Sequence, residues 1–138
     1  REFLKEEAYP WIKEVAVFFD EISIEGEHGK RKLPISSSPE IYDNSAKAWF
    51  SQTTNYDLAM IRWTYEKAVE LALELGLTQE AAHWSQNLEK WPNLAVDQET
   101  GLMFSPEVTY HESHRHFSHL VGFHPLGIIE ISELQKTP

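Results

Sequence analysis

The sequence predicts a mainly α-helical protein in which long polar loops separate the helices. Three segments lead to this expectation, because each repeats apolar residues at steps of three and four, which places them on one face of a helix. The clearest is residues 58–75, whose stripe consists of Leu58, Ile61, Tyr65, Ala68, Ala72 and Leu75.

A second helix follows this one after a short turn. Gly76 suits the left-handed residue that ends a helix, and Thr78 can cap the next one. A further stripe, formed by Ala81, Trp84, Leu88 and Trp91, runs as far as Pro92. Two amphipathic helices joined by about three residues form an αα-hairpin.

The remaining elements are less regular. Residues 3–22 form a third helical stripe, on which Pro10 predicts a kink or the start of the helix. The polar run 25–32 predicts an exposed turn, and residues 94–104 a small β-hairpin with Gly101 in its turn. A short last helix is expected over residues 115–121. The stripe of residues 3–22 consists of Leu4, Ala8, Trp11, Val15, Phe19 and Ile22.

Composition limits the classes of function. The chain has 138 residues, 41% of them hydrophobic, which is enough for one compact domain. Its net charge of −10 opposes binding to nucleic acid or to anionic membranes. Cysteine is absent, which excludes disulfides and thiolate zinc sites but leaves the compartment undetermined. The chain opens at Arg1 in helix-like sequence, which suggests a piece of a longer polypeptide.

Histidines gather near the end of the chain. Five of the seven lie between His111 and His124, around Arg115. Imidazole donates and accepts hydrogen bonds near neutral pH, so the run indicates a polar pocket for an uncharged or anionic ligand. A structural hydrogen-bonding role and a metal site are the alternatives. The zinc motif His-Glu-x-x-His is missed by one residue, and Arg115 would repel a cation.

A second candidate site is the tripeptide Ser38-Pro39-Glu40. Taken locally, it is an ordinary helix start, with Ser as N-cap and Pro in the first turn. Alternatively, Glu40 is held in a loop near Trp49 and Phe50, where an apolar surround would keep its carboxyl protonated as a general acid. Trp49 is also the best candidate platform for stacking on a sugar, since Trp63 and Trp84 lie on helical faces typical of a core. Asn55 and Asp57 are expected to cap the helix that follows.

Four motifs occur in an order known from one enzyme family. They are the YP-x-x-K-x-x-A-x-FF pattern of residues 9–19, the SPE tripeptide, Asn55 to Arg62, and the HRH-x-SHL run of residues 114–120. Together they resemble glycoside hydrolase family 95, the inverting α-L-fucosidases and their α-L-galactosidase relatives. Asn55 stands where that family has Thr, and Ile41-Tyr42 where it commonly has Asn-Gly.

The resemblance implies a fragment of an (α/α)6 barrel built from helical hairpins. Residues 1–138 would be part of a single catalytic domain, incomplete at both ends. Glu40 would be the general acid, and Arg115 and His116 would bind the sugar. His114 and Trp49 complete the predicted substrate-binding set, with His114 or His119 alternatively supporting the residues that bind the sugar.

The resemblance also implies a glycan substrate, no cofactor, and the remainder of the catalytic domain as partner. The asparagine pair and the aspartate of the family's base machinery are not found in the sequence. A bacterial periplasmic or secreted enzyme is expected ahead of a cytoplasmic one. The alternative class is a non-catalytic helical binding or scaffold module with a histidine-rich ligand or metal pocket.

Overall fold

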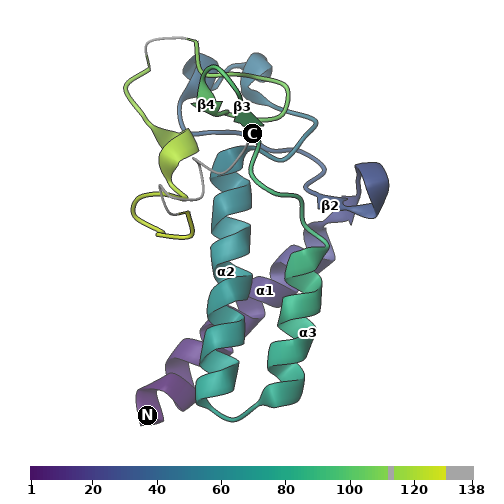
Figure 1. Ribbon diagram of the computed structural model, residues 1–138, viewed down its shortest axis with the longest axis vertical. Helices are drawn as coiled ribbons and strands as arrows, with labels where there is room; N and C mark the ends of the chain where they lie inside the picture. Colours follow the sequence, from purple (N-terminus) through teal and green to yellow (C-terminus); the bar gives the residue numbers. More distant parts are fainter. Residues whose placement is uncertain (112–113, 130–138) are drawn as a thin grey trace. The chain divides into compact units, whose positions relative to one another are not determined.

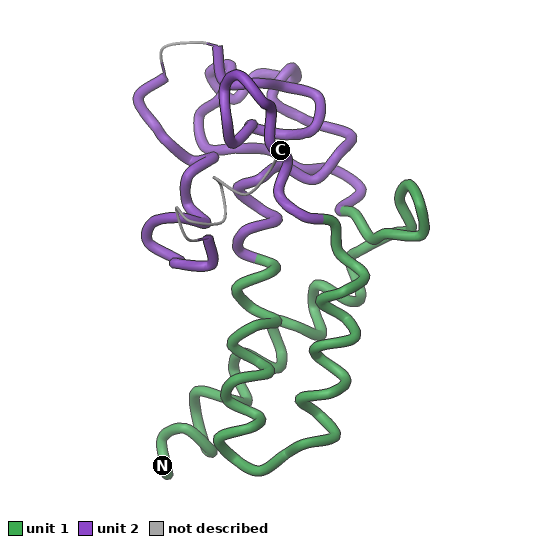
Figure 2. Tube along the Cα trace, viewed as in Figure 1, with its two compact units in different colours: residues 1–32, 61–92 green, residues 33–60, 93–138 purple. Residues whose placement is uncertain are grey.

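The computed structural model describes residues 1–111 and 114–129. The chain divides into two compact units (Figure 2), of which unit 1 comprises Arg1–Lys32 and Ile61–Pro92 and unit 2 comprises Leu33–Met60 and Asn93–Pro138. Both contain part of helix α2 (Asn55–Glu74). Within the described ranges, no helix combines the length and apolar character needed to cross a membrane.

The predicted αα-hairpin is formed by α2 and α3 (Thr78–Glu89) (Figure 1), and all of it except residues 55–60 belongs to unit 1. The turn has the expected helix-ending geometry: Gly76 has φ 76°, and the Leu77 amide donates to the Ala72 carbonyl at 2.8 Å. Thr78 is the first residue of α3 and not its predicted N-cap. The N-cap is Leu77, whose side chain makes no hydrogen bond to the helix. The predicted stripes are largely confirmed: Leu75 and Leu88 are half-buried, and these side chains are buried: Leu58, Ile61, Tyr65, Ala68, Ala72, Ala81, Trp84 and Trp91.

Helix α1 (Tyr9–Ile22) follows a π-helical segment, Leu4–Ala8, and buries a different face from the one predicted. Tyr9, Ile12 and Ala16 are buried, whereas Trp11 is 63% exposed. Apolar residues lie on several sides of this helix, so periodicity alone does not select one. Pro10 lies in the first turn, where its missing N–H breaks no helical hydrogen bond.

Polar contacts with the hairpin explain why that face is the buried one. The Tyr9 hydroxyl donates to Glu80 Oε2 at 2.6 Å and accepts from Trp84 Nε1 at 3.1 Å. Burial, assisted by the Glu80 carboxylate, raises the pKa of Tyr9 to about 12. On the same side of α1, the Tyr65 hydroxyl donates to Asp20 Oδ1 at 2.7 Å. A helix turned to bury Trp11 would lose these partners.

Two short antiparallel strand pairs are present in the described residues. The predicted hairpin is confirmed in unit 2, where β3 (Val96–Asp97) pairs with β4 (Gly101–Leu102) and Gly101 has φ 79°. Asp97 closes the turn by accepting hydrogen bonds from the Glu99 and Thr100 amides. In unit 1, the run predicted as an exposed turn forms a pair of its own, β1 (Ile24–Glu25) with β2 (Arg31–Lys32).

The rest of the described part of unit 2 is largely irregular chain. An isolated bridge joins Ser36 to Phe50, and two 3-10 turns, Ile41–Asn44 and Ala46–Ala48, lie between them. The helix predicted over residues 115–121 is reduced to a 3-10 turn, Ser118–Leu120. Helices this short are costly to nucleate, since the first turn fixes several residues for one hydrogen bond. The segment between Ser36 and Phe50 packs around a small core of Ile41, Ala48, Phe50 and Phe104.

The start of α2 differs from the prediction that Asn55 and Asp57 cap it. Thr54 is the cap, because its hydroxyl accepts the Asp57 amide at 3.2 Å. Asn55 is fully buried and pairs with the backbone of Ala95, donating to its carbonyl and accepting from its amide, both at 2.8 Å.

Asp57 serves the loop that precedes α2. Its carboxylate accepts the Ser36 hydroxyl at 2.6 Å, while the Ser36 oxygen accepts the Thr54 amide at 2.8 Å. The Thr54 hydroxyl in turn donates to the Ser37 carbonyl at 2.7 Å. Burial raises the pKa of Asp57, against the opposing effect of the Ser36 hydrogen bond. These bonds tie residues 36–37 to the first turn of α2.

Candidate active site

Glu40 lies in a tight turn and not in a helix. The Ile41 amide donates to the Ser38 carbonyl at 3.2 Å, and Glu40 has φ 57° and ψ 10°. Since Pro39 must have a negative φ, this combination is a type II turn, in which the third position favours glycine. A side chain held there costs roughly 1–2 kcal/mol. The predicted helix start at Ser38 is therefore wrong.

The Glu40 carboxylate faces two basic side chains. Arg115 Nη2 donates to Glu40 Oε2, and His116 Nε2 lies 3.0 Å from the same oxygen without the alignment of a hydrogen bond. The three side chains are accessible, with exposed fractions of 40% for Glu40, 76% for Arg115 and 43% for His116. The apolar surround expected for Glu40 is thus replaced by a polar, charged one.

The two residues that precede Glu40 in the turn, Ser38 and Pro39, are also held by the histidine-rich segment. His114 Nε2 lies 3.1 Å from the Pro39 carbonyl oxygen. Because a carbonyl can only accept, this nitrogen bears a proton. The hydroxyls of Ser38 and Ser118 are 2.5 Å apart, and both residues are buried. Residues 38–40 are therefore each bonded to the segment 114–118.

His119 anchors that segment in the interior of unit 2. It is 7% exposed, and its ring stacks on Tyr110 with centroids 4.4 Å apart. Phe104 packs against both His119, at 5.2 Å, and His114, at 5.8 Å. Burial lowers the pKa of His119, and His114 adds to the effect by its charge. His119 is thus a neutral packing residue at neutral pH, and among the described residues its buried Nδ1 does not make the hydrogen bond that the structural alternative for the run predicts.

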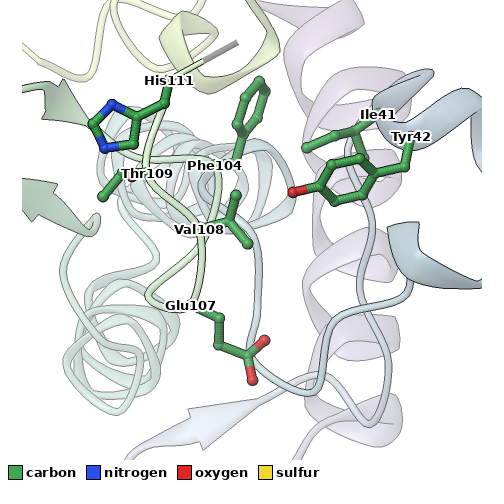
Figure 3. A pocket seen from close by; sticks show the side chains of 7 residues that line it. All are labelled: Ile41, Tyr42, Phe104, Glu107, Val108, Thr109 and His111. Carbon is green, nitrogen blue, oxygen red and sulfur yellow. The ribbon is translucent and has the colours of Figure 1, made fainter.

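A cavity of about 290 Å³ lies next to the turn (Figure 3). Ile41 and Tyr42, which directly follow Glu40, form one wall, and Phe104 and Val108 lie between them and His111. Its volume is at the lower end of ligand pockets, about 300–1,000 Å³. Thr109 and Glu107 complete the lining. Sequence reasoning did not identify this cavity, because its walls come from two segments about 60 residues apart with no shared motif.

The predicted site residues are brought together with one exception. Glu40, Arg115 and His116 meet directly, and His114 joins them through Pro39. Trp49 is 64% exposed, and no ring contact or side-chain hydrogen bond of its indole is found in the described part of the chain. Ser118 and Tyr110 were not predicted, since a hydroxyl pair 80 residues apart leaves no signal in one sequence. Among residues 1–111 and 114–129, no group of three or more His, Asp or Glu is arranged to hold a metal ion.

Comparison with known proteins identifies the family. Residues 1–137 match the glycosyl hydrolase family 95 catalytic domain, which covers essentially the whole chain. No curated protein matches the sequence. The predicted resemblance is therefore confirmed, and so is the mainly helical fold class with a small β-hairpin. The chain belongs to the glycosyl hydrolase family 95 catalytic domain family.

Proposed function

We propose that this chain contributes the general acid of an inverting glycosidase that removes terminal α-L-fucosyl or α-L-galactosyl groups. Family membership supports hydrolysis of a glycan. The observation on which the finer proposal rests is the contact of Glu40 with Arg115 and His116, across 75 and 76 positions of sequence. A carboxyl group beside donors suited to sugar hydroxyls is what acid-catalysed glycoside cleavage needs.

In this mechanism, Glu40 protonates the glycosidic oxygen as the bond to the anomeric carbon breaks. A base on the opposite face of the sugar activates a water molecule, with the two carboxyl groups about 6.5–9.5 Å apart. The base is supplied by residues outside this chain, because the sequence contains no counterpart of the family's base motifs. His116 and Arg115 bind hydroxyl groups of the sugar and fix its orientation.

The contact between Arg115 and Glu40 imposes a condition on this mechanism. A neighbouring guanidinium favours the ionised carboxylate, whereas a general acid must hold a proton. Arg115 therefore exchanges Glu40 for sugar hydroxyls when the substrate binds. Its high exposure leaves the side chain free to make this exchange.

We further propose that residues 1–138 are part of a single (α/α)6 barrel domain. The α2–α3 hairpin is a repeating unit of such a barrel. Several large apolar side chains of unit 1 are exposed, including Trp11 and Phe18, and further hairpins would cover them. The site is completed by the remainder of that domain, so the test requires the polypeptide that contains it.

The decisive experiment compares Glu40→Gln with Glu99→Gln, an exposed glutamate of the β3–β4 turn. Each is assayed on an α-L-fucoside or α-L-galactoside whose leaving group is a sugar. Removal of a general acid lowers the rate about 10²–10⁴-fold. We expect this loss in Glu40→Gln, with sugar affinity retained, and wild-type turnover in Glu99→Gln. Near-wild-type turnover in Glu40→Gln would overturn the assignment.

The alternative to a glycosidase is a non-catalytic binding module, and assays of the wild-type polypeptide distinguish the two. It would be favoured if the wild-type polypeptide hydrolysed neither glycoside and bound zinc tightly at fixed stoichiometry in a calorimetric titration.

A further inference from the structure

We infer that His114 and Ser118 are positioning residues that hold the acid turn in the one conformation that presents Glu40 to the glycosidic oxygen. The inference rests on the proposed role of Glu40 as the acid. Of the two roles that the sequence left open for His114, it selects support over sugar binding and names the turn as what His114 supports. The two contacts that lead to it are His114 Nε2 to the Pro39 carbonyl, at 3.1 Å, and the Ser38–Ser118 hydroxyl pair, at 2.5 Å.

The Pro39 carbonyl is the group that distinguishes the two turns available to this tripeptide. Types I and II differ by a rotation of about 180° of the peptide between the second and third residues, here Pro39 and Glu40. Without support, the type I turn is preferred for a residue that is not glycine, because it avoids the left-handed conformation. A donor at His114 that bonds the carbonyl in its type II orientation opposes this rotation.

The rotation would move the Glu40 side chain. In the type I turn Glu40 would have a φ near −90°, whereas it has 57° in the structure. Such a change redirects the bond from the backbone to the side chain. The carboxyl would then leave its place beside Arg115 and His116. The His114 hydrogen bond therefore selects the direction in which the acid points.

Ser118 holds the start of the same turn. Ser38 is 2% exposed and Ser118 8%, so each hydroxyl is buried with the other as its partner. Loss of one hydroxyl leaves the other buried without that hydrogen bond. Because the next residue, His119, is fixed by stacking on Tyr110, Ser118 is a rigid point of attachment.

His114 has little freedom to serve the sugar instead. Its Nε2 is engaged by Pro39, and its ring packs edge-on against Phe104, at 5.8 Å, and His116, at 5.6 Å. A substrate that took over Nε2 would release the carbonyl and allow the turn to rotate. Support of the acid and direct sugar binding through this nitrogen are therefore mutually exclusive.

The test uses the catalytically active polypeptide with the variants His114→Leu, His114→Gln and Ser118→Ala. Ser45→Ala is the matched control, because Ser45 is exposed in the same loop and its hydroxyl caps no helix. For each variant, kcat and KM are measured on a glycoside with a sugar leaving group and on the 4-nitrophenyl glycoside. The nitrophenolate leaves with little need of a proton, so it reports on sugar binding without the acid.

Misplacement of a catalytic group by about 1 Å can cost 10²-fold in rate. We expect His114→Leu and Ser118→Ala to lower kcat about 10–100-fold on the sugar leaving group, with KM and nitrophenyl hydrolysis near wild type. His114→Gln should recover part of the rate, because its amide can donate to the Pro39 carbonyl. Ser45→Ala should match wild type.

Two results would overturn the inference. A rise of KM on both substrates with kcat preserved would make His114 a sugar ligand, and wild-type kinetics in both His114→Leu and Ser118→Ala would leave neither residue a role. Thermal unfolding of each variant identifies any that fails to fold, in which case His114→Gln and Ser118→Ala decide. Glu40→Gln in the same assay separates the proposals: if only that variant is inactive, the acid assignment stands and the positioning role fails.

Discussion

Substitution of Asn55 tests how the β3–β4 hairpin is attached to helix α2. Asn55→Ala removes two hydrogen bonds, one in each direction between the side-chain amide and the backbone of Ala95. The Ala95 carbonyl keeps a second partner, since the Met103 amide also donates to it at 3.1 Å. The Ala95 amide loses the acceptor that Asn55 provides. The substitution therefore leaves one group, the Ala95 N–H, without its acceptor.

The expected loss follows from this inventory. A lost neutral hydrogen bond contributes about 1 kcal/mol and an N–H left unpaired costs about 1–3 kcal/mol, with Ala95 at the lower end because it is only half-buried. We expect Asn55→Ala to lower the free energy of unfolding by about 2 kcal/mol, which is a factor of about 30 in the folded-to-unfolded ratio.

Urea denaturation followed by circular dichroism measures this change, and hydrogen exchange of the Ala95 amide shows where it arises. Asn93→Ala is the control, because Asn93 is exposed two residues before Ala95. Asn55→Asp sharpens the test. Its oxygen still accepts the Ala95 amide, but its charge opposes the carbonyl until the carboxyl is protonated. The difference in the free energy of unfolding between Asn55→Asp and wild type should therefore be smaller at acid pH. If Asn55→Ala stayed within 0.5 kcal/mol of wild type, roughly the spread expected of an ordinary surface substitution, the reasoning would be refuted.

Two further predictions concern side chains at the centre of each unit. Tyr9→Phe should lower the free energy of unfolding by about 1–3 kcal/mol, because it leaves the buried Trp84 N–H without its acceptor. Urea denaturation checks this, and a midpoint equal to wild type would contradict it. The second concerns pH: burial lowers the pKa of His119 below its ordinary value of 6.5, so the unfolded chain takes up this proton first as the pH falls. The contribution of His119 to the free energy of unfolding should therefore be fully present above about pH 6.5 and decline below it. His119→Phe should make the free energy of unfolding less dependent on pH in this range. If the variant showed the same pH dependence as wild type, that dependence would belong to other groups.

The α2–α3 hairpin could be predicted from sequence because its signals agree. A single apolar stripe, a glycine at the helix end and a proline after the second helix all indicate the same boundaries. Helix α1 shows the limit of this reasoning, since apolar residues such as Trp11 lie outside its buried face. There, the Tyr9 hydroxyl and its partners decide the orientation, and such contacts depend on the tertiary fold.

The candidate site was predictable only in part, and for a similar reason. The motifs identified Glu40, Arg115 and His116, but not the conformation that unites them. Local propensity favours a helix start at Ser38, whereas tertiary contacts hold a type II turn. Residues nearby in sequence predict an apolar surround for Glu40. The structure instead gives Glu40 partners from the distant histidine-rich segment.

The hydrogen bonds between residues 36–37 and the first turn of α2 bear on how this loop can change during evolution or design. They fix the chain ahead of Glu40 without any help from residues 43–47, all of which are exposed. Insertions or deletions within residues 43–47 can be accommodated at the surface, while the backbone that carries Glu40 stays in place. Diversification of the loop, by nature or in a library, can therefore reshape what approaches the acid without moving the acid itself.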